Sequence, residues 1–221
     1  MICISVAAPT VEEAKRILAS GPEADLFEIR LDALREPAVA PFFSLSKPLI
    51  FTFRAQEEGG LRPAPLEERL FWLREAATHG ASFVDLELAC GPEAVAQLRS
   101  GLRETRLILS YHNFQKTPSK AYLCDKIKEM VELKADVGKV VCMVRRPEEG
   151  LELLSLIVWA RRKFDLPLVA FGMGPAGRWT RAVSLFLGAP FTFAASRTGA
   201  ETAPGQLVAE DLRKVLKILG V

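Results

Sequence analysis

The sequence predicts an α/β fold in which eight parallel strands and eight helices form a (β/α)₈ TIM barrel, as a single compact domain over residues 1–221. Short apolar runs rich in β-branched residues alternate along the whole chain with longer amphipathic segments. Such an alternation is typical of parallel sheets with right-handed crossovers. Eight units in 221 residues leave about 28 residues for each, close to the length of a βαβ module.

The predicted strands are runs in which apolar side chains dominate, as expected where a parallel sheet is covered on both faces. They span residues 2–8, 26–32, 49–54, 83–88, 107–111, 137–144, 168–173 and 191–195.

The predicted helices repeat apolar residues every three or four positions. The pattern is clear over residues 66–77 and loose over residues 34–46. The remaining candidates span residues 11–19, 92–100, 119–134, 147–164, 177–187 and 206–219.

An open doubly wound sheet is the alternative to a closed barrel. Its nucleotide-binding versions are disfavoured because no G-x-G-x-x-G motif follows the first strand and no G-x-x-x-x-G-K-[ST] motif occurs.

Composition excludes several classes of protein. The chain is 49% hydrophobic and 25% charged with a net charge of +2, which is ordinary for a globular protein and unlike a disordered one. The balanced charge gives no general attraction to phosphate, so we expect no nucleic-acid partner. No apolar run approaches the roughly 20 residues of a membrane helix, and no basic segment typical of a signal peptide begins the chain. We therefore expect no membrane partner.

The four cysteines have no C-x-x-C spacing, and the chain has only two histidines. We therefore expect no metal site and a reduced, cytoplasmic protein. Cys3 and Cys142 lie inside apolar runs, where we expect them to be small buried hydrophobes.

Charged residues interrupt two of the predicted strands. Glu28, Arg30 and Asp32 alternate with apolar residues, which places all three on one face of a strand. Asp85 and Glu87 alternate in the same way. In a barrel the active site lies at the carboxyl ends of the strands, so these charges are candidates for its lining. A salt-bridge set inside the barrel without a ligand remains the alternative, as do solvated charges if the strand lies at an edge.

Lys139 is the only one of eleven lysines inside an apolar strand-like run. Burial disfavours the ammonium form of a lysine, and a neutral amine attacks carbonyl groups to form a Schiff base. The alternative interpretation is an ion pair with Glu28, Asp85 or Glu87. Both interpretations remain open from the sequence alone. His112 directly follows another apolar strand and is a candidate acid–base group.

Arg181 lies early in the seventh predicted helix. An arginine at this face of a barrel can bind a carboxylate through two hydrogen bonds. The alternative is an ordinary surface arginine.

Taken together, these residues make the chain resemble the type I 3-dehydroquinate dehydratases, the lysine-dependent enzymes of the shikimate pathway. The resemblance runs from the first strand to the last helix. Its motifs are weak singly and specific in this order. The segments that carry it are Phe27–Asp32, Phe51–Arg54, Glu58–Gly60, Val84–Leu88, Ser110–Phe114, Ala135–Lys139 and Ala203–Gln206.

The resemblance implies a TIM barrel that needs no cofactor and acts on 3-dehydroquinate. Lys139 would form an imine with the substrate ketone. His112 would remove the C2 proton and then protonate the departing C1 hydroxyl, giving 3-dehydroshikimate in the third step of the pathway. Glu58 would orient His112. The resemblance also implies a homodimer.

Eight further residues match positions that hold the substrate in this family. They are Glu28, Arg30, Arg54, Arg181, Thr202, Gln206, Met173 and Phe193. Thr202 departs from the serine that the family usually has there. A class I aldolase and a non-catalytic metabolite-binding barrel remain the alternatives. The Glu-x-Arg pair and the histidine favour dehydration of a polyhydroxylated ring.

Overall fold

The computed structural model describes residues 1–21, 24–44 and 46–220. Within these residues it has eight strands: β1 (Ile2–Val6), β2 (Leu26–Arg30), β3 (Leu49–Thr52), β4 (Phe83–Glu87), β5 (Arg106–Asn113), β6 (Val137–Met143), β7 (Leu168–Met173) and β8 (Thr192–Ala194). All pair in parallel in one sheet of order β7-β6-β5-β4-β3-β2-β1-β8.

Seven α-helices follow these strands in the described part of the chain: α1 (Val11–Ala19), α2 (Leu66–Thr78), α3 (Gly91–Arg99), α4 (Lys120–Glu132), α5 (Pro147–Phe164), α6 (Thr180–Phe186) and α7 (Ala209–Leu219). Local sequence sets several of their ends. The Thr10 hydroxyl accepts a hydrogen bond from the Glu13 amide at 3.2 Å and so caps α1. Pro147 opens α5, where its fixed φ suits the first turn.

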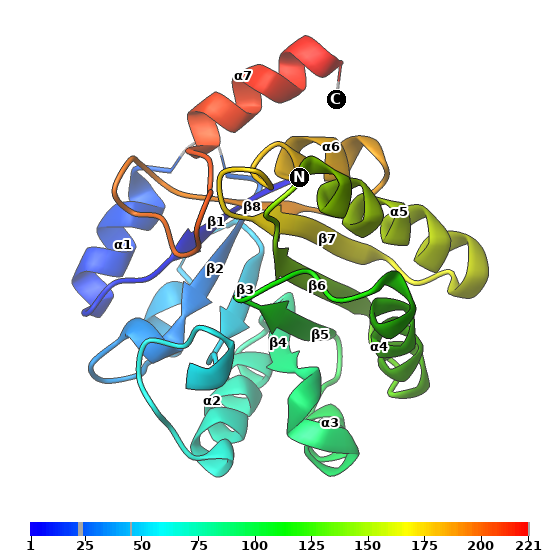
Figure 1. Ribbon diagram of the computed structural model, residues 1–221. Helices are drawn as coiled ribbons and strands as arrows, with labels where there is room; N and C mark the ends of the chain where they lie inside the picture. Colours follow the sequence, from blue (N-terminus) through cyan, green and yellow to red (C-terminus); the bar gives the residue numbers. More distant parts are fainter. Residues whose placement is uncertain (22–23, 45, 221) are drawn as a thin grey trace.

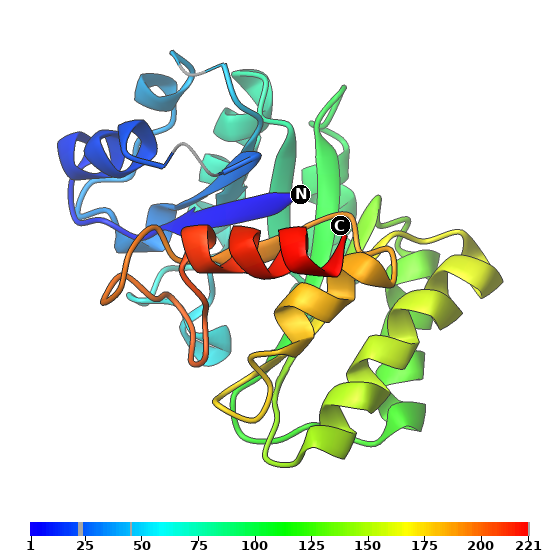
Figure 2. The same ribbon diagram turned by 90° about the horizontal axis from the view of Figure 1, so that it is seen from above.

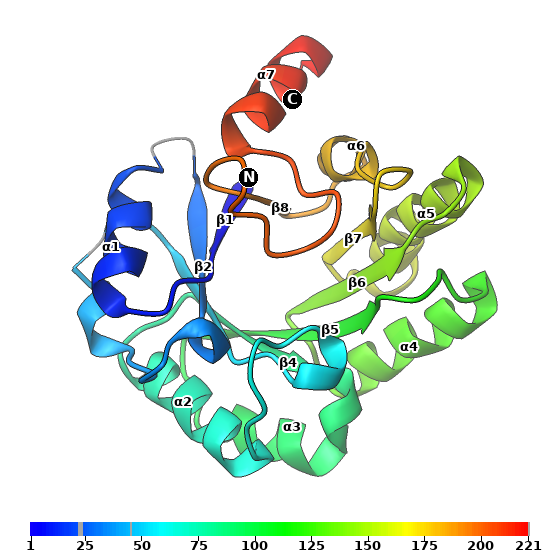
Figure 3. The ribbon, with the colours of Figure 1, turned by 60° about the vertical axis from the view of Figure 1, so that its left-hand side comes forward.

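The strands form a ring, and the helices stand outside it (Figures 1 and 3). The ring is nearly closed, because β8 pairs with β1 whereas β7 and β8 share no ladder among the described residues. The last helix, α7, lies beside β1 and covers that side of the barrel (Figure 2). The predicted barrel is thus confirmed, with seven α-helices among the described residues in place of the eight predicted.

The missing helix is the one predicted over residues 34–46. This segment holds only a short 3₁₀ turn, Ala40–Phe42, and Leu45 lies outside the described residues. Pro37 and Pro41 explain the error, because each proline lacks an amide donor and clashes with the preceding turn of a helix. The segment is anchored instead by Phe42, which is fully buried.

Several other predicted boundaries differ from the observed ones by one to three residues, and two of these differences concern the candidate residues Gln206 and Asp32. The last helix begins at Ala209 rather than Gln206, so Gln206 lies in the loop before it. Strand β2 ends at Arg30, and Asp32 lies in a 3₁₀ turn, Leu31–Ala33. Asp32 therefore does not share the strand face with Glu28 and Arg30.

The core has two parts. Outward-facing strand residues pack against the helices, and a separate apolar cluster fills the barrel interior. Inside, aromatic rings run in sequence from the floor towards the mouth: Phe83 contacts Phe191, Phe191 contacts Phe193, and Phe193 contacts Phe171, with ring centroids 5.6–6.2 Å apart. Any cavity in the barrel must therefore lie above this packed floor.

The cysteine and hydropathy predictions can be compared with the structure. Cys3 and Cys142 are buried, as predicted. None of the described helices combines the length and the apolar character that crossing a membrane requires.

Candidate active site

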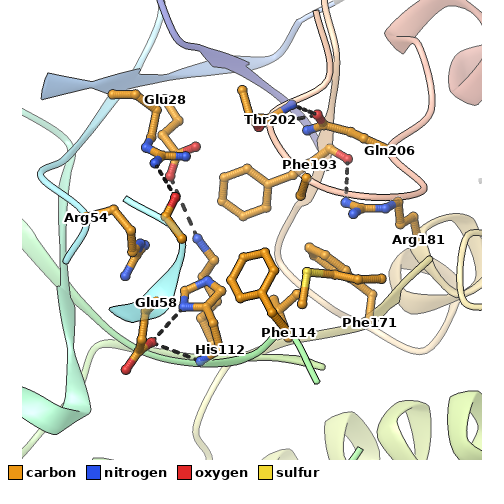
Figure 4. A pocket seen from close by; sticks show the side chains of 16 residues that line it. Glu28, Arg54, Glu58, His112, Phe114, Phe171, Arg181, Phe193, Thr202 and Gln206 are labelled. Atoms are coloured by element: carbon orange, nitrogen blue, oxygen red, sulfur yellow. Dashed lines mark hydrogen bonds and ion pairs between the residues drawn. The ribbon is translucent and has the colours of Figure 1, made fainter. Parts of the chain in front are cut away.

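A pocket opens at the carboxyl ends of the strands and contains about 460 Å³ of empty space, part of it open to solvent (Figure 4). All eleven residues that the resemblance assigns to the site line it. The strand pattern also made Asp32, Asp85 and Glu87 candidates for the lining, and these three do not line it. The lining residues are Glu28, Arg30, Arg54, Glu58, Gly59, His112, Phe114, Lys139, Val141, Phe171, Met173, Arg181, Phe193, Thr202, Ala203 and Gln206. The strand register brings these distant residues to one place, at the end of a TIM barrel where active sites form.

Lys139 points into the pocket from β6 and is 4% exposed. Its Nζ lies 2.9 Å from Asp85 Oδ2 and 3.7 Å from Glu28 Oε1. The amine also lies 4.2 Å from the ring centroid of Phe193. The ion pair expected as one alternative therefore exists. This ion pair does not exclude a role for Lys139 as a Schiff-base nucleophile, because the same amine lines a cavity.

Arg54 neutralises the acids around this lysine. Its guanidinium lies 2.8 Å from Asp85 and 3.0 Å from Glu87, and it donates to the Ser110 hydroxyl at 2.6 Å. Burial alone would raise the pKa of Asp85, but Arg54 and Lys139 hold that pKa well below its usual value. Asp85 is therefore a fixed negative charge beside the amine.

His112 and Glu58 form a second pair among the lining residues of the pocket (Figure 4). Glu58 Oε2 accepts the His112 backbone amide at 2.9 Å and lies 2.9 Å from Nδ1. When Glu58 is ionised, it accepts a hydrogen bond from the N–H at Nδ1 of His112. The other ring nitrogen, Nε2, then carries the lone pair. Burial lowers the pKa of His112 well below its usual value, with Arg54 and Lys139 adding to the effect. Burial has the opposite effect on the Glu58 carboxyl and raises its pKa to about 7.

Arg181 is fully buried and lacks a carboxylate partner among the described residues. One nitrogen donates to the Phe193 carbonyl at 3.2 Å, and the guanidinium lies 4.3 Å from the Phe171 ring centroid. Its Nε and the other terminal nitrogen have no hydrogen-bond partner in the described structure. Burial, with a contribution from Arg178, lowers the pKa of Arg181 to about 9, so it remains charged at neutral pH. Buried charges are normally paired, so this side chain is set to receive an anion.

The family model of the type I 3-dehydroquinases matches residues 2–221. The chain belongs to the type I 3-dehydroquinase family. The resemblance found in the sequence is thereby confirmed. As a member of this family, the chain carries the family's motifs on the strands and loops that converge on the pocket.

The relatives of this chain match it along nearly its whole length. The 3-dehydroquinate dehydratase of Desulfotalea psychrophila is 37% identical over 217 residues, covering 97% of this chain and 96% of the relative. That of Thermococcus onnurineus is 37% identical over 224 residues, covering 100% and 99%. The crystal structure of the enzyme from Geobacillus kaustophilus superposes with a TM-score of 0.87 at 30% identity, covering 99% of this chain and 90% of that one.

In this type I 3-dehydroquinase, the loop between β8 and α7 passes over the barrel mouth (Figure 3). Within that loop, Gln206 Oε1 accepts the Thr202 amide at 2.7 Å and lies 3.3 Å from its hydroxyl. The threonine hydroxyl therefore takes part in the loop's own hydrogen bonding.

Sequence reasoning missed five lining residues of this family member: Gly59, Phe114, Val141, Phe171 and Ala203. Period-two alternation from Lys139 leads to Val141, and from Met173 it leads back to Phe171. Gly59 lies in the segment Glu58–Gly60 that carries the resemblance, and the structure gives the physical reason for a glycine there. Its φ is +88°, and a Cβ there would lie 2.4 Å from the Phe114 ring.

Proposed function

We propose that this protein is a hydro-lyase that converts 3-dehydroquinate to 3-dehydroshikimate in the shikimate pathway, with residues 1–221 as one catalytic domain. The observation that carries the proposal is the convergence of Lys139, the His112–Glu58 pair and the unpaired Arg181 on one pocket. An amine, an acid–base group and an anion receptor are the three functions that imine-based dehydration of a keto acid needs. The curated relatives named above support the same reaction.

In the first step, the Lys139 amine attacks the C3 carbonyl of the substrate. A C=N bond forms and the carbonyl oxygen leaves as water, which gives an imine. Asp85 accepts an N–H of the amine at 2.9 Å and directs the nitrogen within the pocket. The Phe193 ring lies against the amine and excludes water from that side.

In the second step, His112 removes the C2 proton, whose electrons pass into the imine. The C1–O bond then breaks, and the departing hydroxyl takes the proton back from His112 to leave as water. A further water hydrolyses the imine, releases the product and restores the Lys139 amine. Glu58 supports this cycle because, as a carboxylate, it keeps the proton on Nδ1 and the lone pair on Nε2.

This arrangement predicts an acid limb in the pH dependence of kcat. As pH falls through about 7, Glu58 becomes protonated and no longer accepts from Nδ1, since burial raises its pKa to about 7. We expect kcat to fall below that pH. In Glu58→Gln this limb is expected to disappear, because glutamine does not titrate. The kcat of both proteins from pH 5.5 to 9 checks this, and an unchanged limb in Glu58→Gln would refute the assignment.

Arg181 is expected to bind the substrate carboxylate. Arg181→Met should raise KM about 10- to 100-fold, because a charge-assisted hydrogen bond contributes about 1.5–3 kcal/mol. Arg178→Met is the matched control, since Arg178 is a neighbouring exposed arginine that does not line the pocket. Steady-state kinetics on both variants test the role. A KM for Arg181→Met within twofold of the control would contradict it.

The activity itself is tested with the purified protein and 3-dehydroquinate. The product contains a conjugated enone, so its formation is followed by ultraviolet absorbance and its identity by mass spectrometry. Absence of product from a folded protein would overturn the proposed function.

The homodimer and the cytoplasmic location remain predictions from the sequence. Sedimentation equilibrium of the purified protein measures the first, and a single species of 24.3 kDa would contradict it.

A further inference from the structure

Asp32 is a buried carboxylate that does not line the pocket, although it follows the Glu-x-Arg pair that does. Its Oδ1 accepts the Arg30 Nε at 2.9 Å and the Arg54 backbone amide at 3.2 Å. Its Oδ2 accepts the Arg30 Nη2 at 2.6 Å and the Leu61 backbone amide at 2.9 Å. Each oxygen of Asp32 therefore accepts one hydrogen bond from the Arg30 guanidinium and one from a backbone amide.

These two amides belong to the loop between β3 and α2, where they form the ends of the segment 54–61. Glu58 and Gly59 lie between them in this segment. Arg30, oriented by Asp32, also donates to the Gly59 carbonyl at 3.1 Å. Asp32 thus holds both ends of the segment directly and its middle through one side chain.

The loop has little freedom between these points. The Gly60 amide donates to the Ala55 carbonyl at 2.9 Å, and a Cβ on Gly60 would lie 2.2 Å from the Arg54 carbonyl oxygen. A second carboxylate, Glu87, accepts the Ala55 amide at 2.8 Å. A tight loop fixed at its ends transmits a displacement of either end to the Glu58 carboxylate.

We propose that Asp32 is a positioning residue, which fixes Glu58 against His112 through the loop and aims Arg30 into the pocket. Its two routes have different kinetic consequences. Loss of the loop contacts disturbs the acid–base pair and lowers kcat, whereas loss of the Arg30 contacts disturbs a pocket wall and raises KM. The inference rests on the proposed function, because it assigns Asp32 a part in that reaction.

Asp136 provides a control for a structural carboxylate, with a side chain that is 36% exposed where that of Asp32 is fully buried. It accepts the Leu107 backbone amide at 2.7 Å and an Arg99 nitrogen at 3.2 Å. It therefore has the same kinds of partner as Asp32. Its partner Leu107 lies at the start of β5, at the end of the barrel away from the pocket.

The experiment compares Asp32→Asn with Asp136→Asn in the full-length protein. We expect Asp32→Asn to lose about 30- to 100-fold in kcat, with KM raised several-fold and the acid limb near pH 7 displaced, as befits a disturbed acid–base pair. Asp136→Asn should keep kcat within about twofold of wild type. A double-mutant cycle adds a direct test of the loop route. Introducing Asp32→Asn into Glu58→Gln should cost at most about fivefold in kcat, since the group being positioned is already lost.

Three outcomes overturn the proposal: an unchanged pH profile in Asp32→Asn, equal losses in the two asparagine variants, or full additivity with Glu58→Gln. If Asp32→Asn does not fold, Asp32→Glu retains the charge, shifts the oxygens by one methylene and is judged by the same two readouts. The two hypotheses are separable. A wild-type protein that fails to convert 3-dehydroquinate refutes the proposed function, whereas an active wild type with an indifferent Asp32 refutes this inference alone.

Discussion

Lys139→Met is expected to reduce kcat for 3-dehydroquinate by at least about 10⁴-fold, because no imine forms without the amine and losing a covalent nucleophile alone costs most of the rate enhancement. The fold is expected to survive. Asp85 keeps Arg54 at 2.8 Å as its counter-charge. Glu28 loses the amine at 3.7 Å but still accepts hydrogen bonds from the Ser5 and Thr52 hydroxyls. Turnover at saturating substrate and a thermal melt measure the two effects.

The control is Lys163→Met, which removes an exposed lysine at the end of α5. It should match wild type in both measurements. A Lys139→Met protein that retains more than about one hundredth of the wild-type kcat would contradict covalent catalysis by this residue, since an effect that small falls within the range of acid–base or positioning roles.

His112→Ala is expected to lower kcat by about 10²–10⁴-fold, the usual contribution of a general acid–base group. The imine should still form, because Lys139 and its partner Asp85 are untouched. Borohydride added with substrate should therefore trap an adduct on the variant, while product formation is nearly lost. Mass spectrometry of the reduced protein and a turnover assay on the same sample give both quantities.

The other histidine is the control for this variant. His79 ends α2, stacks on Phe43 with ring centroids 5.8 Å apart and lies outside the pocket. His79→Ala should leave kcat unchanged. A near-normal rate in His112→Ala would remove His112 from the acid–base role, and loss of the trapped adduct would instead place it in imine formation.

The barrel was predictable because periodicity and chain order determine it. The hydropathy pattern of each run indicates which of its faces is buried. Eight strand–helix pairs in sequence are compatible with only a few topologies. The missing second helix shows where this reasoning fails. The apolar residues over 34–46 resembled a helical pattern. In the structure Phe42 is buried, but it lies in a 3₁₀ turn and not in an α-helix. Two prolines outweighed the pattern, and weighting them would have corrected the prediction.

The residues of the site and the Glu58–His112 pair were predictable, whereas the partner of Lys139 was left open among three acids. The resemblance supplied the eleven lining residues by position. Pairing depends on register: Lys139 lies beside Ser110, and Ser110 lies beside Glu87 on the next strand. No pattern in one sequence could tell that Asp85 rather than Glu87 contacts the amine. The sequence also did not show that β2 ends at Arg30. The position of Asp32 outside the strand therefore could not be predicted.

The net charge of +2 does not indicate where the unpaired charge of the site lies. Arg30 and Arg54 are matched by acids at 2.6–3.0 Å, whereas Arg181 has no acid partner in the described structure. A balanced chain can therefore attract an anion at one buried point. Composition averages over the whole chain, so it gave no sign of this feature.

The central claim is the imine on Lys139, and borohydride trapping with 3-dehydroquinate tests it most directly. We predict irreversible loss of activity, together with a mass gain equal to the reduced substrate adduct on the peptide that contains Lys139. Borohydride without substrate should leave mass and activity unchanged. If the protein turns over 3-dehydroquinate while borohydride plus substrate changes neither its mass nor its activity, the covalent mechanism is wrong.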